Sequence, residues 1–334
     1  MIPEKEKPLI DECLAAESKQ GSDDANGLPS RLNRYSKAHH RALLMADYAR
    51  EQGEVKLALN LTNCGHYLHF RHFFQVEKIR LHAAQFCNKH LLCPLCAIRR
   101  GAKQVQAYLA RLETIRQVNP DLKLSLVTLT VKNGADLGER FRHLTGAFRA
   151  MQQARRNYQK ARGPYVEMAK FEGAVGSYEF KRGKGSSEWH PHLHMVVLHR
   201  QSISAAALSA DWLKYTGDSF IVDVTPFDEE QGEVDGFLEV FKYALKFSDL
   251  PLADNWQGFE TLSGKRLVFS FGLFWGVEVP EELTEEDLEN EPFVDLLFRF
   301  SKGSGYSFLP MKTESKIKPF VQGEVVMLST RKAA

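Results

Sequence analysis

The segment at residues 189–198, WHPHLHMVVL, constrains the fold of this chain more than any other stretch. Pro191 favours an extended backbone, and the β-branched and apolar residues that follow it predict a β-strand. Side chains two positions apart in a strand project from the same face, so His192 and His194 point the same way. Two imidazoles on one face are half of a metal site, although two ordinary histidines on a partly wet strand would give the same pattern.

An acidic residue precedes this strand on a second strand-like segment. Residues 174–181 contain Glu179 and lead into residues 183–187, GKGSS, which have the composition of a hairpin loop. If the two strands pair antiparallel with Glu179 opposite His192 or His194, its carboxylate lies beside the imidazoles, whereas a slip of one residue turns it to the other face.

These residues predict a divalent metal site. The expected ligands are His192, His194 and Glu179, and His190 is the alternative third ligand because it has the same parity as His192. Mixed imidazole and carboxylate ligands suit manganese or magnesium better than an all-thiolate shell would.

Downstream, residues 236–247 have a helical pattern. Glu239 and Tyr243 lie four positions apart in this segment, which puts a carboxylate and a phenol on one helix face. Lys242 and Lys246 belong to the same segment and can neutralise a neighbouring phosphate. A tyrosine that only packs on an amphipathic helix would have the same spacing. The assignment of Tyr243 as a nucleophile therefore depends on the histidine pair upstream.

Three motifs therefore occur in order: the strand segment 126–130 (LVTLT), the pair at 192–194 (HLH) and the segment 239–246 (EVFKYALK). This order resembles that of the HUH endonucleases and, more narrowly, of the single-tyrosine rolling-circle replication initiators (Rep proteins) of small bacterial plasmids. The likeness runs from about Cys64 to about Gly276. Each motif is weak alone, but three in the right order are specific.

The resemblance implies metal-dependent, site- and strand-specific DNA nicking at a double-strand origin. Tyr243 would be the nucleophile that forms a 5′-phosphotyrosyl link and leaves a free 3′-OH primer. Four residues after it stands Phe247 rather than a second tyrosine, so Glu239 is expected to assist termination by hydrolysis. The implied partners are plasmid origin DNA, both double-stranded and as an exposed single strand, and a host helicase and DNA polymerase.

The order of the expected elements predicts an α+β fold. Strands, helices and a hairpin between residues 119 and 255 suit an antiparallel sheet with helices on one face and the site on the other. The resemblance implies the HUH (RRM-like) form of this fold, a central antiparallel sheet of about five strands with flanking helices.

Four cysteines predict a structural zinc site. Cys64, Cys87, Cys93 and Cys96 fall close together, and the last two form a Cys-x-x-Cys turn that suits a tetrahedral four-sulfur shell. His66 or His90 can replace one sulfur, and a redox pair or free buried thiols remain alternatives. The family resembled here also has a cysteine set before its first strand motif, which favours zinc.

Charge is unevenly distributed along the chain. Residues 1–28 carry −4, residues 29–200 carry +17 and residues 201–334 carry −11, which together give the net +2 of the chain. The basic middle is a candidate surface for nucleic acid, with Arg99 and Arg100 at the start of an expected helix as plausible phosphate contacts. No apolar stretch is long enough to span a bilayer and residues 1–20 lack a signal-peptide pattern, so a cytoplasmic protein without a membrane partner is expected.

Four regions are predicted. Residues 1–30 form a disordered acidic tail, residues 31–118 a helical, cysteine-rich zinc-binding region, residues 119–255 the endonuclease core, and residues 256–334 an acidic C-terminal extension of that core without an assigned role. The helix of the second region is expected to begin at Ser36, and the basic stretch after Cys64 to be helical or irregular.

Two other classes of protein share parts of this pattern. A zinc-containing, non-catalytic DNA-binding regulator needs only the basic middle and the four cysteines, not Tyr243 or the histidine pair. A relaxase or transposase of the same superfamily shares the chemistry but has another biological role, and many relaxases have the tyrosine near the N-terminus.

Overall fold

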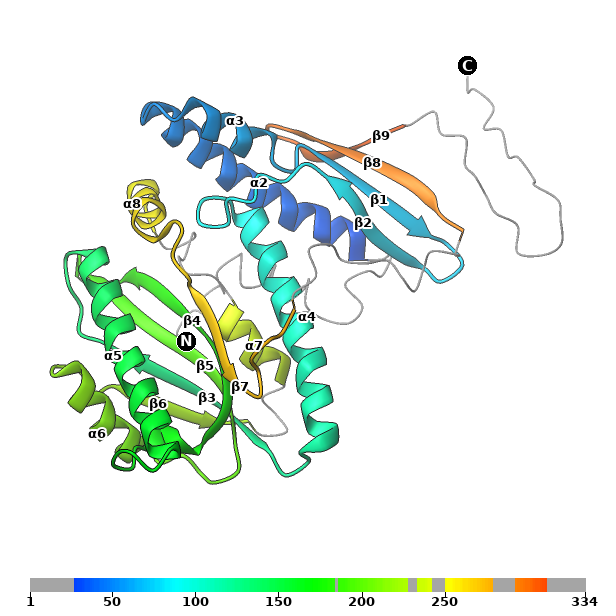
Figure 1. Cartoon of the computed structure of the whole chain (residues 1–334). Coiled ribbons are helices and arrows are strands. Elements are labelled where there is room, and N and C mark those ends of the chain that lie inside the picture. Colours follow the sequence, from blue (N-terminus) through cyan, green and yellow to red (C-terminus); the bar gives the residue numbers. More distant parts are fainter. Residues whose placement is uncertain (1–26, 184–185, 228–232, 242–249, 279–291, 311–334) are drawn as a thin grey trace, which may run out of the picture. The chain divides into compact units, whose positions relative to one another are not determined.

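The computed structural model describes residues 27–183, 186–227, 233–241, 250–278 and 292–310 (Figure 1). The described residues form two compact units, one within residues 97–280 and the other made of residues 19–96 and 281–334. The predicted N-terminal tail up to residue 26, and Lys242, Tyr243 and Lys246, lie outside the described residues.

A five-stranded antiparallel sheet forms the centre of the first unit, with the strand order β6-β3-β5-β4-β7. Its strands are β3 (Lys123–Thr130), β4 (Phe171–Arg182), β5 (Trp189–His199), β6 (Val222–Pro226) and β7 (Val268–Gly272). The predicted α+β class with a five-stranded antiparallel sheet is therefore confirmed. The long hairpin of β4 and β5 lies at the middle of the sheet because strands that are apolar on both faces are stable only where both faces are covered.

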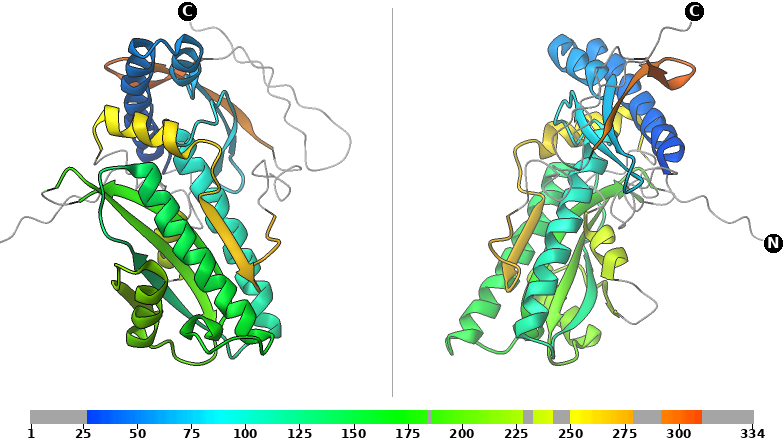
Figure 2. Two further views of the ribbon diagram at one scale, coloured as in Figure 1. Left: turned by 60° about the vertical axis from the view of Figure 1, so that its left-hand side comes forward. Right: turned by 90° about the vertical axis from the view of Figure 1, so that its right-hand side faces the viewer.

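Helices cover both faces of this sheet, so the expectation of helices on one face only is wrong (Figures 1 and 2). Helix α5 (Leu137–Gln159) packs through Phe148 against Phe269 of β7, with ring centres 4.8 Å apart. On the opposite face, α4 (Pro94–Val118) and α7 (Glu233–Phe241) form an apolar core with β3, β4 and β5.

Two helices of this unit, α5 and α6 (Ala205–Thr216), begin at residues whose side chains cap them. Asp136 caps α5 by accepting a hydrogen bond from the Glu139 backbone N–H. Ser204 caps α6 in the same way, and Gly217 ends that helix in the left-handed conformation, with φ of 77°. A short 3₁₀ helix, η2 (Glu167–Lys170), precedes β4, and α8 (Leu252–Leu262) precedes β7.

The second unit contains a four-stranded antiparallel sheet in the order β2-β1-β8-β9, with two helices. The strands are β1 (Tyr67–Phe73), β2 (Lys78–Ala84), β8 (Val294–Ser301) and β9 (Gly305–Leu309), and the helices are α2 (Leu28–Glu51) and α3 (Val55–Asn63).

Two local predictions for this unit are wrong. The basic stretch after Cys64 is a β-hairpin rather than a helical or irregular segment, because Leu68 and Phe70 alternate with His69 and Arg71 and bury one face of β1. Helix α2 begins at Leu28 instead of Ser36, since a proline in its first turn suits a helix start.

None of the described helices has both the length and the apolar character that crossing a membrane requires.

Candidate metal centres

The histidine pair and Glu179 meet on one face of the central hairpin. In the observed register Glu179 lies opposite His192, as one of the two predicted pairings requires. The Nε2 atom of His194 lies 2.8 Å from Oε2 of Glu179. All three residues are buried, so their interactions are exposed to little competing water.

Two threonines of β3 orient the imidazoles. The Thr128 hydroxyl lies 3.0 Å from Nδ1 of His194, and the Thr130 hydroxyl lies 3.1 Å from Nδ1 of His192. Each threonine is the direct cross-strand neighbour of its histidine. Because both hydroxyls contact Nδ1, each ring keeps Nε2 for a ligand, which is how neighbouring groups usually fix a metal-binding histidine.

His192 has the protonation state that metals require. Burial, followed by the nearby charge of Lys181, lowers the pKa of His192 to about 3, so its imidazole is neutral at physiological pH. Its Nε2 atom is buried and has no hydrogen-bond partner among the described residues. A buried, neutral nitrogen without a partner is costly unless something binds it, so it fits a metal ligand.

Helix α7 adds a second carboxylate. Ligand atoms of Glu179, His194 and Glu239 all lie within 4.8 Å of one another. The helix is held against β4 by a hydrogen bond from the Ser177 hydroxyl to the carbonyl of Val240, and by the burial of Phe237 and Phe241. The site therefore draws on three strands and one helix, and it includes Glu239, which the sequence related only to Tyr243.

The sheet face that carries this site is polar at one end and apolar along the rest of its length. Val175, Val196 and Leu198 lie on the same face as Glu179 and the histidines but belong to the apolar core under α4 and α7. The polar groups thus occupy one end of a face whose remainder is a packed core, which fixes their geometry.

The other predicted site residues do not belong to the group formed by Glu179, His194 and Glu239. His190 is half-buried, and its Nδ1 contacts the side-chain oxygen of Asn133, while its ring meets that of His192 edge-on, with centres 4.2 Å apart. Arg99 and Arg100 lie near the start of α4, half-buried and exposed respectively. Tyr243 follows the last described residue of α7, Phe241, by two positions.

The arrangement fits a divalent cation. The ligand atoms of Glu179 and His194 lie together with the Glu239 carboxylate nearby, and His192 presents its Nε2 on the same face, outside that group of three. Mixed imidazole and carboxylate donors suit manganese or magnesium better than an all-thiolate shell would. Such an ion would replace the hydrogen bond between His194 and Glu179. Thr128, Thr130 and Ser177, which support this site, were not singled out as site residues from the sequence, although Thr128 and Thr130 have the parity of one strand face.

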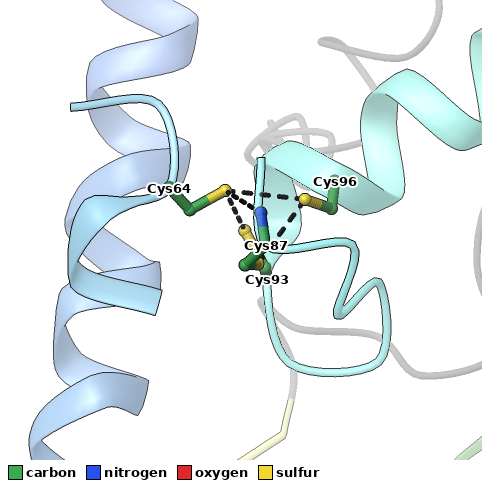
Figure 3. Close-up of side chains that lie close together, drawn as sticks. All are labelled: Cys64, Cys87, Cys93 and Cys96. Carbon is green, nitrogen blue, oxygen red and sulfur yellow. Dashed lines mark hydrogen bonds between the residues drawn. The ribbon is translucent and has the colours of Figure 1, made fainter. Parts of the chain in front are cut away.

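A second cluster joins the four cysteines in the other unit (Figure 3). Cys64 follows α3, Cys87 lies in the loop after β2, and Cys93 and Cys96 flank the start of α4. The Sγ atom of Cys64 lies 3.5 Å from those of Cys93 and Cys96, and Cys87 Sγ lies 3.6 Å from Cys96 Sγ.

These distances match a tetrahedral metal–thiolate shell. With Zn–S bonds of about 2.3 Å, sulfur atoms at the corners of a tetrahedron are separated by about 3.8 Å. The backbone N–H of Cys87 also donates to Cys64 Sγ, which stabilises a thiolate. Gly65 allows the turn after Cys64, because its φ is +69° and a Cβ there would lie 2.4 Å from Leu95.

Comparisons with known proteins relate this chain to replication proteins. The family model described as "Replication protein" (Rep_1) matches residues 78–297, more than half of the chain, which include the histidine pair, Glu179, Glu239 and Tyr243. A protein named "Protein rep" from Lactiplantibacillus plantarum is 26% identical over 72% of this chain and 79% of its own length.

Two further relatives bear the same name. The protein from a Bacillus species is 26% identical over 72% of this chain and 85% of its own length. The protein from Streptococcus pneumoniae serotype 2 (strain D39) is 26% identical over 76% of this chain and 80% of its own length. No solved structure matches the chain. The extent of the family match shows that this chain belongs to the Rep_1 family of replication proteins.

Proposed function

We propose that the protein initiates rolling-circle replication of a plasmid by nicking one DNA strand at the double-strand origin. The observation that carries this proposal is the contact of His194 with Glu179 at 2.8 Å, beside His192 and next to the helix that leads into Tyr243. A regulator that only binds DNA needs no such buried cluster of imidazoles and carboxylates.

In this proposal Tyr243 attacks the scissile phosphate. A new bond joins the phenolic oxygen to phosphorus, the bond from phosphorus to the 3′ oxygen breaks, and the phenolic proton leaves, so that the 3′ oxygen becomes a hydroxyl. A manganese or magnesium ion on His192, His194 and Glu179 would polarise the phosphate and offset its developing negative charge. Lys242 and Lys246 would contact neighbouring phosphates, and Arg99 and Arg100 the DNA further along.

The 5′-phosphotyrosyl bond retains the energy of the phosphodiester for later rejoining, while the 3′-OH primes a host DNA polymerase behind a host helicase. Zinc on Cys64, Cys87, Cys93 and Cys96 would have a structural role, because four thiolates leave no open coordination position for a substrate.

The direct test uses supercoiled plasmid that carries the replicon of this protein, with manganese. We expect a nicked circle with protein attached to the 5′ end, and no nick in EDTA. Tyr243→Phe should abolish both the nick and the attachment, whereas Tyr158→Phe, an exposed tyrosine on α5, should change neither. A Tyr243→Phe protein that still nicks and attaches would refute the proposal, and so would full nicking in EDTA.

Glu239 should act at the end of the cycle. Four positions before Tyr243, its carboxylate can take the proton of a water that cuts the regenerated junction, so termination needs no second tyrosine. We expect Glu239→Ala to nick and attach normally but to overrun the end of one round and yield multi-unit single strands on denaturing gels.

The closeness of Glu239 to Glu179 and His194 makes a second measurement necessary. If its role is confined to hydrolysis, Glu239→Ala should bind manganese with the affinity of the unmodified protein, as should the control Asp235→Ala, an exposed acid on the same helix. Normal termination by Glu239→Ala, or loss of the first nick as complete as in Tyr243→Phe, would show that Glu239 lacks this role.

A further inference from the structure

A row of positive charge lies on the exposed face of α5, which packs on the sheet face opposite the histidine site. Arg142, Arg149 and Arg156 are all exposed and seven residues apart, and exposed Lys160 follows at the end of the helix. Seven residues are nearly two turns, so the three arginines point in almost the same direction at intervals of about 10.5 Å. We call these four residues the α5 stripe.

The charges of the α5 stripe are not neutralised within the described part of the chain. None of its four residues has a carboxylate oxygen within 4.0 Å there. The acids near α5 are engaged elsewhere, because Glu139 pairs with Arg140 and Asp218 pairs with His143.

Other arginines of the same helix have structural roles and contrast with the stripe. Arg155 donates to the carbonyl of Phe171 at 2.6 Å, and its guanidinium lies 4.9 Å from the ring centre of Phe271. Within the stripe, Arg142 donates to the carbonyl of Gly138 and Arg156 donates to the side-chain oxygen of Gln153, both on α5 itself. These neutral acceptors leave the positive charges of the stripe without a carboxylate partner among the described residues.

Two more cations extend the positive surface beside α5. Lys265 Nζ lies 5.6 Å from the ring centre of Phe141, on the inner side of α5. Lys265 and its neighbour Arg266 are both exposed, and they lie in the turn between α8 and β7. The surface therefore reaches from α5 to the turn before β7.

We propose that the α5 stripe binds the phosphate backbone of duplex DNA. From Arg142 to Arg156 it spans about 21 Å, the axial length of roughly six base pairs, in a rigid helix that can hold several phosphates at once. Single-stranded DNA is the poorer fit along the three arginines, because Gly146, Ala150 and Gln153 lie between them and offer no aromatic ring on which bases could stack. The exposed Tyr158 lies beyond Arg156.

This inference rests on the proposed function and adds a duplex-binding surface to it. A nicking enzyme that also binds duplex DNA can hold the origin while one strand is cut. Phosphate contacts of this kind position a protein without reading the base sequence. The stripe should therefore contribute affinity and salt dependence but no sequence preference.

The test compares two charge-matched variants of the full chain. The stripe variant carries Arg142→Gln, Arg149→Gln and Arg156→Gln, and the control carries Lys56→Gln, Lys123→Gln and Lys214→Gln, three exposed lysines on other elements. Fluorescence anisotropy measures binding to a duplex of about 30 base pairs and to a single strand of the same length, between about 50 and 200 mM salt.

We expect the stripe variant to bind the duplex at least about tenfold more weakly, with the slope of log affinity against log salt reduced by about 2.7, since each phosphate contact contributes about 0.9. The control should keep most of the slope, and the stripe variant should nick a single-stranded oligonucleotide as the unmodified protein does. If the triple variant melts at a lower temperature, Arg149→Gln alone, with a slope reduced by about 0.9, replaces it.

An unchanged slope, an equal loss in the control, or an equal loss of single-strand binding would overturn the assignment of duplex DNA to the α5 stripe. Failure of the unmodified protein to nick would instead refute the proposed function and leave the duplex-binding comparison intact.

Discussion

Replacing Cys93 by serine should release the zinc and unfold the unit that contains the cysteine cluster. Cys93 is fully buried, and its sulfur lies 3.5 Å from that of Cys64. A structural zinc site contributes on the order of 10 kcal/mol to folding, which is comparable to the whole stability of a typical domain. Metal analysis should find about one zinc per chain in the unmodified protein and none in Cys93→Ser, with a lost or broadened thermal transition.

Cys13→Ser is the matched control, because Cys13 lies outside the described residues and far in sequence from the cluster. It should keep its zinc and its melting temperature. Folded, zinc-free protein with four freely titrating thiols would rule out the zinc site.

His194→Ala should remove nicking while the protein still binds duplex DNA. The imidazole joins Glu179 at 2.8 Å, and a catalytic metal contributes several kcal/mol of transition-state stabilisation. Since each 1.4 kcal/mol is a factor of ten in rate, the nicking rate should fall on the order of a thousandfold. Manganese affinity, measured by calorimetry, should fall with it, which a merely structural histidine would not produce.

Two other histidines provide comparisons. His143 is half-buried on α5, where it contacts Asp218, and His143→Ala should nick at the normal rate. His190→Ala distinguishes the possible third ligands, because His190 contacts Asn133 whereas Glu179 faces His194. Unchanged manganese affinity in His194→Ala would contradict the proposed metal site. A larger loss of manganese affinity in His190→Ala than in Glu179→Gln would identify His190, rather than Glu179, as the third ligand.

Local sequence was enough to predict the central hairpin and its polar face. The residues after Pro191 have strong strand preference, and a slip of one residue would have buried Glu179 among apolar side chains on the other face. The observed pairing of Glu179 with His192 follows that constraint. The cysteine spacing likewise predicted a cluster, because a Cys-x-x-Cys turn brings two sulfur atoms together without any distant contact.

The pairing of strands that lie far apart in the sequence could not be predicted from local patterns. Strand β1 pairs with β8, and Tyr67 lies opposite Arg299, although more than 200 residues separate them in the chain. Neither segment carries a local signal that identifies its partner. The alternation of Leu68 and Phe70 with polar residues is the pattern of a strand. The histidines and arginines of this segment led instead to its interpretation as a basic, helical or irregular stretch.

The position of Glu239 beside Glu179 and His194 also depends on tertiary structure. Its spacing from Tyr243 is a property of one helix, whereas its approach to Glu179 and His194 depends on α7 packing through Phe237 and Phe241 against the sheet. Helix periodicity gives the first relation and cannot give the second.

The measurement that tests the account most directly identifies the amino acid that is joined to DNA. After reaction with a single-stranded oligonucleotide and manganese, digestion with trypsin and a nuclease followed by mass spectrometry should find one nucleotide-bearing peptide, modified at Tyr243 through a 5′ phosphate. A different modified residue, or a nicked product without any covalent adduct, would contradict the account.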